Sequence, residues 1–334
     1  MRVAEDLNQA LHALLTQNPN AWVLGEDIAD PYGGAFKITK GLTSAFPERV
    51  LTTPISEAGI AGIAGGLALC GNSVVVEMMF ADFLGLAFDQ IVNFASKSVT
   101  MYGEVLPMRM VVRCPAGGRR GYGPTHSQSP QKHFIGVPNL SIHELSPLHP
   151  AAETLARMFA TGAPALLVED KTLYPSATIT ETQVDDLFSV RFLDGARNLA
   201  HVRVEGAGEP DAVIIAPGGM LDRALSAARR LLLETEQVCD IIVPAQLYPL
   251  DLGAAHELLA QTRLICFVEE STAGGTWGSE MANGLYRALW GRLRAPITLV
   301  HSLDSVIPAA AHLESQVLVR SDDIFRALTG GLDD

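Results

Sequence analysis

Residues 52–71 read TTPISEAGIAGIAGGLALCG, and Glu57 is the only charged residue among these small and apolar side chains. An apolar environment disfavours an ionised carboxylate, so this pattern predicts a raised pKa for Glu57. A carboxyl group that holds its proton near neutral pH can act as a general acid or base. Glu57 is therefore the first candidate catalytic residue. The alternative is a carboxylate that only interacts with the dipole of a helix N-terminus.

The glycine spacing around Glu57 argues for close packing. Ser56 is a candidate N-cap for a helix that begins at Glu57. Glycines at 59, 62, 65 and 66 would weaken such a helix in isolation, so we expect it to pack tightly against a strand, another helix or a cofactor. The spacing is GxxGxxG within the helix, which disfavours a dinucleotide site of the GxGxxG type.

Length and composition indicate a globular chain of about two domains. The chain has 334 residues, of which 48% are hydrophobic and 18% charged, and its formal net charge is −13. Such a balance, with arginines in pairs and not in patches, speaks against nucleic acid as a ligand. The four cysteines are widely spaced and are expected to be buried free thiols.

The first fifteen residues lack a signal peptide's apolar core, and the uncharged stretch 58–76 fits a helix followed by a strand better than a membrane span. We therefore expect a cytoplasmic protein.

Strand and helix patterns alternate along the chain, which is typical of an α/β fold with largely parallel sheets. We expect two domains, each a mostly parallel sheet flanked by helices. The first domain is predicted for residues 1–180, a linker for 181–208 and a smaller second domain for 209–330. A single helix is expected from Asp82 to about Thr100.

A long loop at 115–138 carries the second candidate residue, His126, within GPTHSQSPQKHF. Loops of this length are usually functional or disordered, and histidine titrates in the range useful for catalysis. His133 competes with His126 for such a role, and either residue could be an ordinary exposed loop histidine. Neither has the HxH or HExxH spacing of a metal site.

With these residues in view, the chain resembles a known family over nearly its whole length. It is similar to the β subunit of the thiamin diphosphate-dependent decarboxylase component of 2-oxo acid dehydrogenase complexes, a group that includes pyruvate, branched-chain and acetoin dehydrogenases. Seven strings occur in the family's order: LGED (24–27), GGAFKITKGL (33–42), RVLTTPISEAGIAG (49–62), EMMFADFLGLAFDQIVNFASK (77–97), HSQSPQKHF (126–134), LVEDKTLYP (167–175) and VEESTAGGTWGSE (268–280).

The resemblance implies a transketolase-like pyrimidine-binding domain, a transketolase C-terminal-like domain and a role for each matching residue. Glu57 would bond ring nitrogen N1′ of the cofactor's aminopyrimidine and favour its imino tautomer, which removes the C2 proton of the thiazolium to give the ylid. Phe83 would lie against the pyrimidine ring, with Ile55 and Met79 as pocket walls and Glu26 as a nearby polar group. His126 would handle protons during decarboxylation or acyl transfer.

The resemblance also implies a partner. In such proteins a GDG…N motif on an α subunit holds the diphosphate and Mg²⁺, and this chain lacks that motif. We therefore expect an α partner, an α₂β₂ assembly and a lipoyl acyltransferase that receives the acyl unit. Departures from the family occur at 243–247, which reads VPAQL, and at 160–163, where some relatives bind a monovalent cation.

The sequence thus predicts a β subunit that acts on a 2-oxo acid or on a related ketol such as acetoin. One alternative is a split transketolase-like carboligase that passes the acyl unit to an aldehyde or another acceptor. A second is a non-catalytic scaffold or regulatory subunit.

Overall fold

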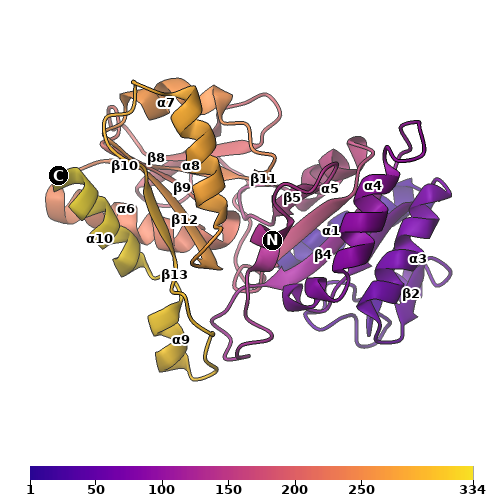
Figure 1. Ribbon diagram of the computed structural model, residues 1–334. Helices are drawn as coiled ribbons and strands as arrows, with labels where there is room; N and C mark the ends of the chain where they lie inside the picture. The colour runs from indigo at the N-terminus through magenta and orange to yellow at the C-terminus, as the bar shows by residue number, and fades with distance from the viewer. Residues whose placement is uncertain (334) are drawn as a thin grey trace. The chain divides into compact units, whose positions relative to one another are not determined.

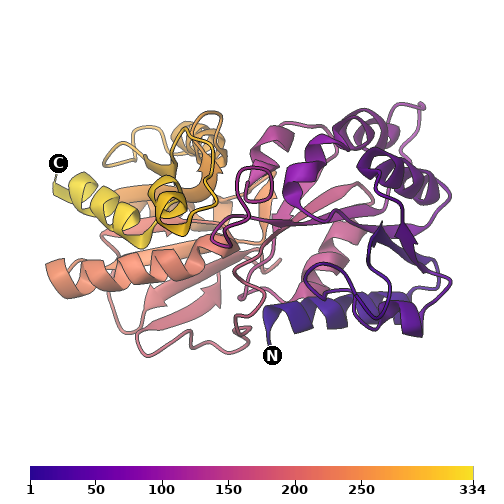
Figure 2. The same cartoon turned by 90° about the horizontal axis from the view of Figure 1, so that it is seen from below.

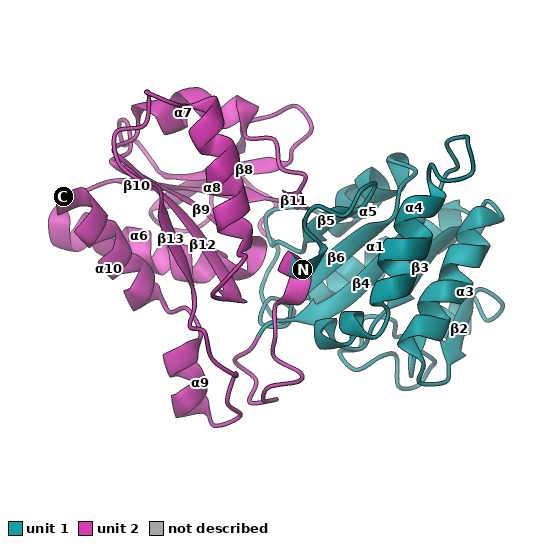
Figure 3. Cartoon of the chain, in the orientation of Figure 1, with its two compact units in different colours: residues 1–117, 133–178 teal, residues 118–132, 179–334 magenta. Residues whose placement is uncertain are grey.

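A computed structural model describes residues 1–333, whose contacts separate them into two compact units (Figures 1 and 3). Unit 1 comprises residues 1–117 and 133–178, and unit 2 comprises 118–132 together with the chain from residue 179 onward. The chain therefore leaves unit 1 for the segment 118–132 and returns before its final crossing. This segment contains His126, so the loop predicted within the first domain is part of unit 2.

Unit 1 is built on a parallel sheet. Its strands lie in the order β5-β6-β4-β3-β1-β2, and each neighbouring pair is parallel. Their bounds are β1 (Ala21–Glu26), β2 (Val50–Thr53), β3 (Ser73–Glu77), β4 (Met110–Ala116), β5 (Ser141–Glu144) and β6 (Ala165–Asp170). The central strands are buried along their whole length, which explains their continuous apolar runs.

Helices cover both faces of this sheet (Figure 1). One face packs against α1 (Val3–Gln17) and α5 (Ala151–Ala160), through a core that includes Leu7, Leu11 and Val75. The other lies under α3 (Glu57–Leu69), whose Gly65 approaches Phe94 so closely that a Cβ would lie 2.4 Å from its Cε1 atom. The close packing predicted for this helix is thus confirmed. The remaining helical elements are α2 (Leu42–Ala45), η1 (Ala81–Gly85), η2 (Gln90–Ala95), α4 (Ser96–Ser98) and η3 (Pro130–Phe134).

Three local predictions for unit 1 need correction. The helix expected from Asp82 to Thr100 is divided into a 3₁₀ turn that ends at Gly85, a π-helical segment and a short α-helix. Glycine has a low helix propensity, and Gly85 lies at the first of these divisions. Ser56 occupies the N-cap of α3, but its side chain makes no capping hydrogen bond. Cys70 is exposed, whereas Cys114, Cys239 and Cys266 are buried free thiols.

Unit 2 contains a mixed sheet with strand order β13-β12-β9-β10-β8-β7. Its strands are β7 (Phe188–Phe192), β8 (Leu199–Val204), β9 (Ala212–Ile215), β10 (Cys239–Pro244), β12 (Leu264–Thr272) and β13 (Thr298–Ser302), and a short strand β11 covers Gln246–Tyr248. The expected linker 181–208 therefore contributes β7 and β8. These strands pair antiparallel to each other, and β8 pairs antiparallel to β10. Their buried apolar residues, among them Phe188, Leu199 and Val202, complete one edge of the core.

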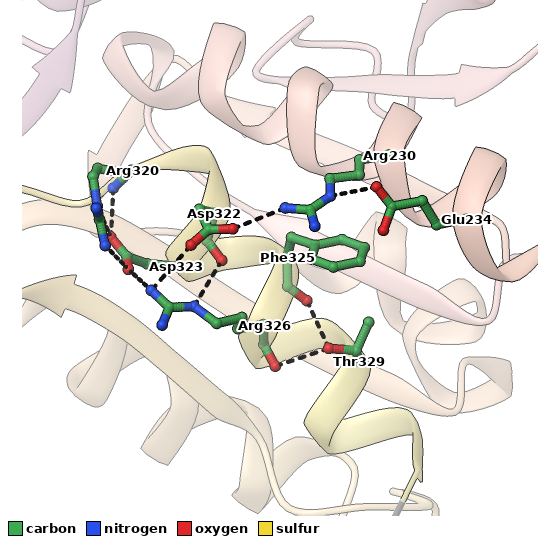
Figure 4. Close-up of polar contacts among 8 residues, drawn as sticks. All are labelled: Arg230, Glu234, Arg320, Asp322, Asp323, Phe325, Arg326 and Thr329. Carbon is green, nitrogen blue, oxygen red and sulfur yellow. Dashed lines mark hydrogen bonds and ion pairs between the residues drawn. The ribbon is translucent and has the colours of Figure 1, made fainter.

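The helices of unit 2 are α6 (Leu221–Thr235), α7 (His256–Gln261), α8 (Trp277–Ala288), α9 (Ala311–Val317) and α10 (Ser321–Asp333), with short turns η4 (Gly218–Met220) and η5 (Gly253–Ala255). Helices α6 and α10 lie side by side (Figure 2). Arg230 of α6 pairs with Glu234 at 2.7 Å and with Asp322 of α10 at 2.8 Å, and its guanidinium carbon lies 3.8 Å from the Phe325 ring centre (Figure 4). Exposed ion pairs of this kind contribute at most about 1 kcal/mol each to the free energy of unfolding.

No helix within residues 1–333 is both long and apolar enough to cross a bilayer.

Candidate active site

Two buried glutamates meet at one end of the unit 1 sheet. Glu26 is the last residue of β1 and Glu57 is the first residue of α3, and they are 6% and 7% exposed. Ligand sites of parallel α/β sheets lie beyond the carboxyl ends of the strands. The chain thus places both predicted acids where such a site is expected.

Within this pair, the pKa of Glu26 is shifted. Burial and, second, the nearby charge of Glu57 raise the pKa of Glu26 above its ordinary value, while a backbone hydrogen bond from Ser56 acts in the opposite direction. Atom Oε1 of Glu26 is buried, and no residue in the described range forms a hydrogen bond with it. A buried polar atom without a partner costs free energy, so Glu26 Oε1 is available to a hydrogen bond with a further group.

Aromatic side chains stand near the start of the next helical segment. Phe83, in η1, is half-buried and makes an edge-on contact with Phe80, with ring centres 5.9 Å apart. Phe80 in turn meets Phe36 at 5.8 Å. Met79 precedes this group and is half-buried, whereas Ile55 is 81% exposed. Ile55 is thus an apolar side chain that unit 1 itself leaves uncovered.

His126 belongs to unit 2, whereas the two glutamates belong to unit 1. Its ring atom Nδ1 lies 2.9 Å from the Thr125 hydroxyl, and its backbone N–H reaches the Gly123 carbonyl at 3.4 Å. The side chain is partly exposed. His133, the competing histidine, is exposed in η3 and is described with unit 1.

A second charged cluster lies inside unit 1 and is absent from the sequence prediction. Arg113 of β4 donates to both Glu169 oxygens at 2.7 and 2.6 Å and also to Glu77, and Tyr174 donates to Glu169 at 2.7 Å. All four residues are at most 5% exposed. We call these four residues the arginine cluster. In the sequence, Glu77, Arg113 and Glu169 follow the apolar runs VVV, VV and LLV, which marks them as charged residues on buried strands. Which of them pair depends on the order of the strands in the sheet.

The charges within the arginine cluster compensate one another. Burial acts to lower the pKa of Arg113, but the charges of Glu169 and Glu77 outweigh it and hold the pKa well above its ordinary value. Burial raises the pKa of Glu77, against the lowering effect of Arg113. A bidentate pair of this kind satisfies its own hydrogen bonds and needs no ligand. No group of three or more His, Cys, Asp or Glu side chains suited to a metal ion occurs in the part of the chain that the structure describes.

Comparison with known proteins places the chain in a family. The transketolase pyrimidine-binding domain family matches residues 1–177, and the transketolase C-terminal domain family matches residues 200–324. A rice protein named pyruvate dehydrogenase E1 component subunit beta-2, mitochondrial, is 32% identical over 98% of this chain and 85% of its own length. The chain belongs to the family of E1 β subunits of 2-oxo acid dehydrogenases.

Two further comparisons add a second relative and a structural neighbour. An Arabidopsis thaliana protein named 2-oxoisovalerate dehydrogenase subunit beta 2, mitochondrial, is also 32% identical, over 92% of this chain and 83% of its own length. A solved structure titled split gene transketolase, inactive beta4 tetramer, aligns with a TM-score of 0.73 over 100% of this chain and 98% of its own, at 21% identity. This structural likeness shows the transketolase-like fold.

Proposed function

We propose that this E1 β chain binds the aminopyrimidine ring of thiamin diphosphate, and that Glu57 and Glu26 supply the polar contacts to the ring. The observation that carries the proposal is the buried acid pair with the unpartnered Oε1 atom of Glu26. An aminopyrimidine ring offers both donors and acceptors, so it fits two adjacent carboxyl groups of which one favours its protonated form. The arginine cluster, whose acids are already paired, offers no comparable vacancy in hydrogen bonding.

The proposed roles are those that the family resemblance implies for each side chain. Thiamin diphosphate, when bound, would supply a cationic thiazolium ring that accepts the electron pair released by decarboxylation. Glu57 would hold a proton at the pyrimidine ring nitrogen, and the raised pKa of Glu26 would limit the negative charge beside it. Phe83 would lie against the ring, while Ile55 and Met79 would exclude water. His126 would move a proton at the substrate or the acyl acceptor.

An α partner completes this proposal. The chain lacks the GDG…N motif expected to hold the diphosphate and Mg²⁺, and its relatives are named as β subunits. Ile55, 81% exposed in this chain, suits a side chain that the partner covers. We propose an α₂β₂ assembly that delivers its acyl unit to a lipoyl acyltransferase.

The substrate is proposed only as a class. Relatives named for pyruvate and for 2-oxoisovalerate are equally similar at 32% identity, which favours a 2-oxo acid without distinguishing its side chain. A ketol such as acetoin remains within the proposal, since its cleavage uses the same cofactor. A cytoplasmic location stays a prediction, because the plant relatives carry mitochondrial names.

Calorimetry tests the divided site directly. Thiamin diphosphate with Mg²⁺ should bind the isolated chain weakly or not at all, and bind tightly once the α subunit is added. The substitution Glu57→Ala should weaken binding in the assembled complex. Glu153→Ala is the matched control, since Glu153 is an exposed glutamate in the first turn of α5. Tight Mg²⁺-dependent binding by the isolated chain would refute the proposal.

A further inference from the structure

Lys132 ends the segment that carries His126, and oxygen atoms surround its ammonium group. Nζ donates to the carbonyls of Thr272 and Gly274, both at 2.7 Å. The Ala273 carbonyl and the Thr272 hydroxyl lie at 3.4 Å. A lysine ammonium has three donors and strongly prefers such a shell when it is partly removed from water. We call these four oxygens the carbonyl cage.

The carbonyl cage belongs to a fixed turn between β12 and α8. The Ala273 N–H donates to the Ser302 carbonyl at 3.0 Å, which ties the start of the turn to β13. Gly274 and Gly275 have φ values of +87° and +56°, in the left-handed region that glycine adopts without steric cost. At the far end, Glu269 accepts the Gly278 N–H at 2.6 Å and holds the beginning of α8. Hydrogen bonds on both sides therefore hold the turn that carries the carbonyl cage.

The opposite end of the His126 segment is also tied to unit 2. Glu270 of β12 accepts the Gly118 N–H at 2.8 Å, and Glu314 of α9 accepts the Arg119 N–H at 2.8 Å. Arg223 of α6 pairs with Glu270 at 3.0 Å and supports this attachment. The segment 118–132 is thus fastened at its first two residues and at its last.

We propose that Lys132 is a positioning residue for His126, and that its ammonium acts as a built-in monovalent cation in the carbonyl cage. Lys132 lies six positions after His126, so loss of its hydrogen bonds removes one restraint on this side of the histidine while the Gly118 end stays attached. The relevance of this restraint to turnover rests on the proposed function of His126. The restraint itself is a property of the full chain and can be measured without cofactor.

Hydrogen exchange of the full-length chain tests the restraint. Lys132→Ala and the longer Lys132→Met should each increase amide exchange in residues 120–132 about tenfold, as expected for loss of charge-assisted hydrogen bonds. Lys97→Ala is the matched control, because Lys97 is an exposed lysine bonded to the side chain of Asn93. Two variants of different size separate the loss of charge from the loss of packing. Unchanged exchange in both would overturn the proposal.

Chemical rescue tests the built-in cation. Backbone carbonyl rings can replace the hydration shell of a small monovalent ion, so ammonium at about 0.1 M should restore protection in Lys132→Ala. Tetramethylammonium at the same ionic strength is too large for the carbonyl cage and should not restore it. Absence of rescue by ammonium, or equal rescue by both ions, would overturn the assignment of Lys132 as a cation substitute.

Turnover of the complex with the α subunit separates this inference from the proposed function. Lys132→Ala should lower kcat more than it changes KM, with recovery in ammonium. His126→Ala should abolish that ammonium effect on turnover, yet the protection of residues 120–132 should still depend on Lys132. A full activity of His126→Ala would contradict the proposed role of His126 and leave the exchange result standing. Conversely, loss of the exchange effect alone would contradict only the role of Lys132.

Discussion

Two sets of buried acids lie in unit 1, and they differ in whether the protein satisfies them. In the arginine cluster, Arg113 links Glu77 and Glu169, and Tyr174 adds a further hydrogen bond. In the site pair, Glu26 and Glu57 lie near each other without a cation between them, and Glu26 Oε1 has no partner within residues 1–333. Similar chemistry therefore has a structural role in one set and is available to a ligand in the other.

The alternation of side chains along a strand explains how both sets fit one sheet. Gly25 stands beside Glu77 in the register of β1 and β3, so Glu77 shares a face with Gly25 while Glu26 points to the opposite face. Tyr174 of the arginine cluster belongs to the core formed with α1 and α5. The site pair faces the side of α3, whose first residue is Glu57. Because Glu26 is the residue after Gly25, it lies on the opposite face of the sheet from Glu77. The candidate catalytic acids are thus separated from the structural acids.

The comparison is tested most strongly at Glu57. Glu57→Gln keeps the size of the side chain but cannot exchange a carboxyl proton, so turnover of the complex with the α subunit should fall about 10²- to 10⁴-fold. The unfolding free energy should change little, because Glu57 is not part of the arginine cluster. Steady-state turnover and urea denaturation measure the two effects, with Glu153→Gln as control. Undiminished turnover would favour the non-catalytic scaffold over the proposed function.

Arg113→Met should chiefly lower the free energy of unfolding. It leaves Glu77 and Glu169 buried without their cation, and breaking such a pair costs about 3–5 kcal/mol of unfolding free energy. Urea denaturation measures this loss. The combined change Arg113→Met, Glu77→Gln and Glu169→Gln removes the uncompensated charges and should recover part of the stability. A loss below about 1 kcal/mol would indicate that the arginine cluster is no more stabilising than a surface ion pair.

The smallest effect is expected at Glu26 and depends on pH. A pKa raised in the folded chain means that folding retains a proton, so stability should fall as pH rises from the ordinary value of 4.5 through the raised pKa. Glu26→Gln should remove this decline and be more stable than wild type above that interval. Denaturation from about pH 5 to about pH 8 measures the difference, with exposed Glu48→Gln as control.

The charge of Glu57 provides a sharper form of that experiment. Because Glu57 contributes to the raised pKa of Glu26, Glu57→Gln should narrow the pH interval over which stability declines. Parallel stability curves for wild type, Glu26→Gln and Glu57→Gln would show that the two carboxyl groups are not coupled.

Local pattern was sufficient for most of unit 1 and for Glu57, whereas Glu26 became a candidate only through the family resemblance. Apolar runs ended by acids, as in VVVE, predicted buried strands that the structure contains, and the helix that begins at Glu57 is α3. Local pattern failed where packing decides. Strands β7 and β8 read as a linker because they form an edge, and the helix after Asp82 is interrupted. The residue roles drawn from the family resemblance stay predictions.

The sequence by itself determined the strand periodicity, the acids at 26 and 57 and the match to the E1 β family. Only the tertiary structure decided that Arg113 satisfies Glu77 and Glu169 while Glu26 Oε1 stays unpartnered, and that unit 2 holds the His126 segment through Lys132 and Gly118. These outcomes depend on contacts between residues 30 to 150 or more positions apart in sequence, such as Gly118 with Glu270. Local propensity cannot specify such pairings, because the register and order of strands fix which side chains meet.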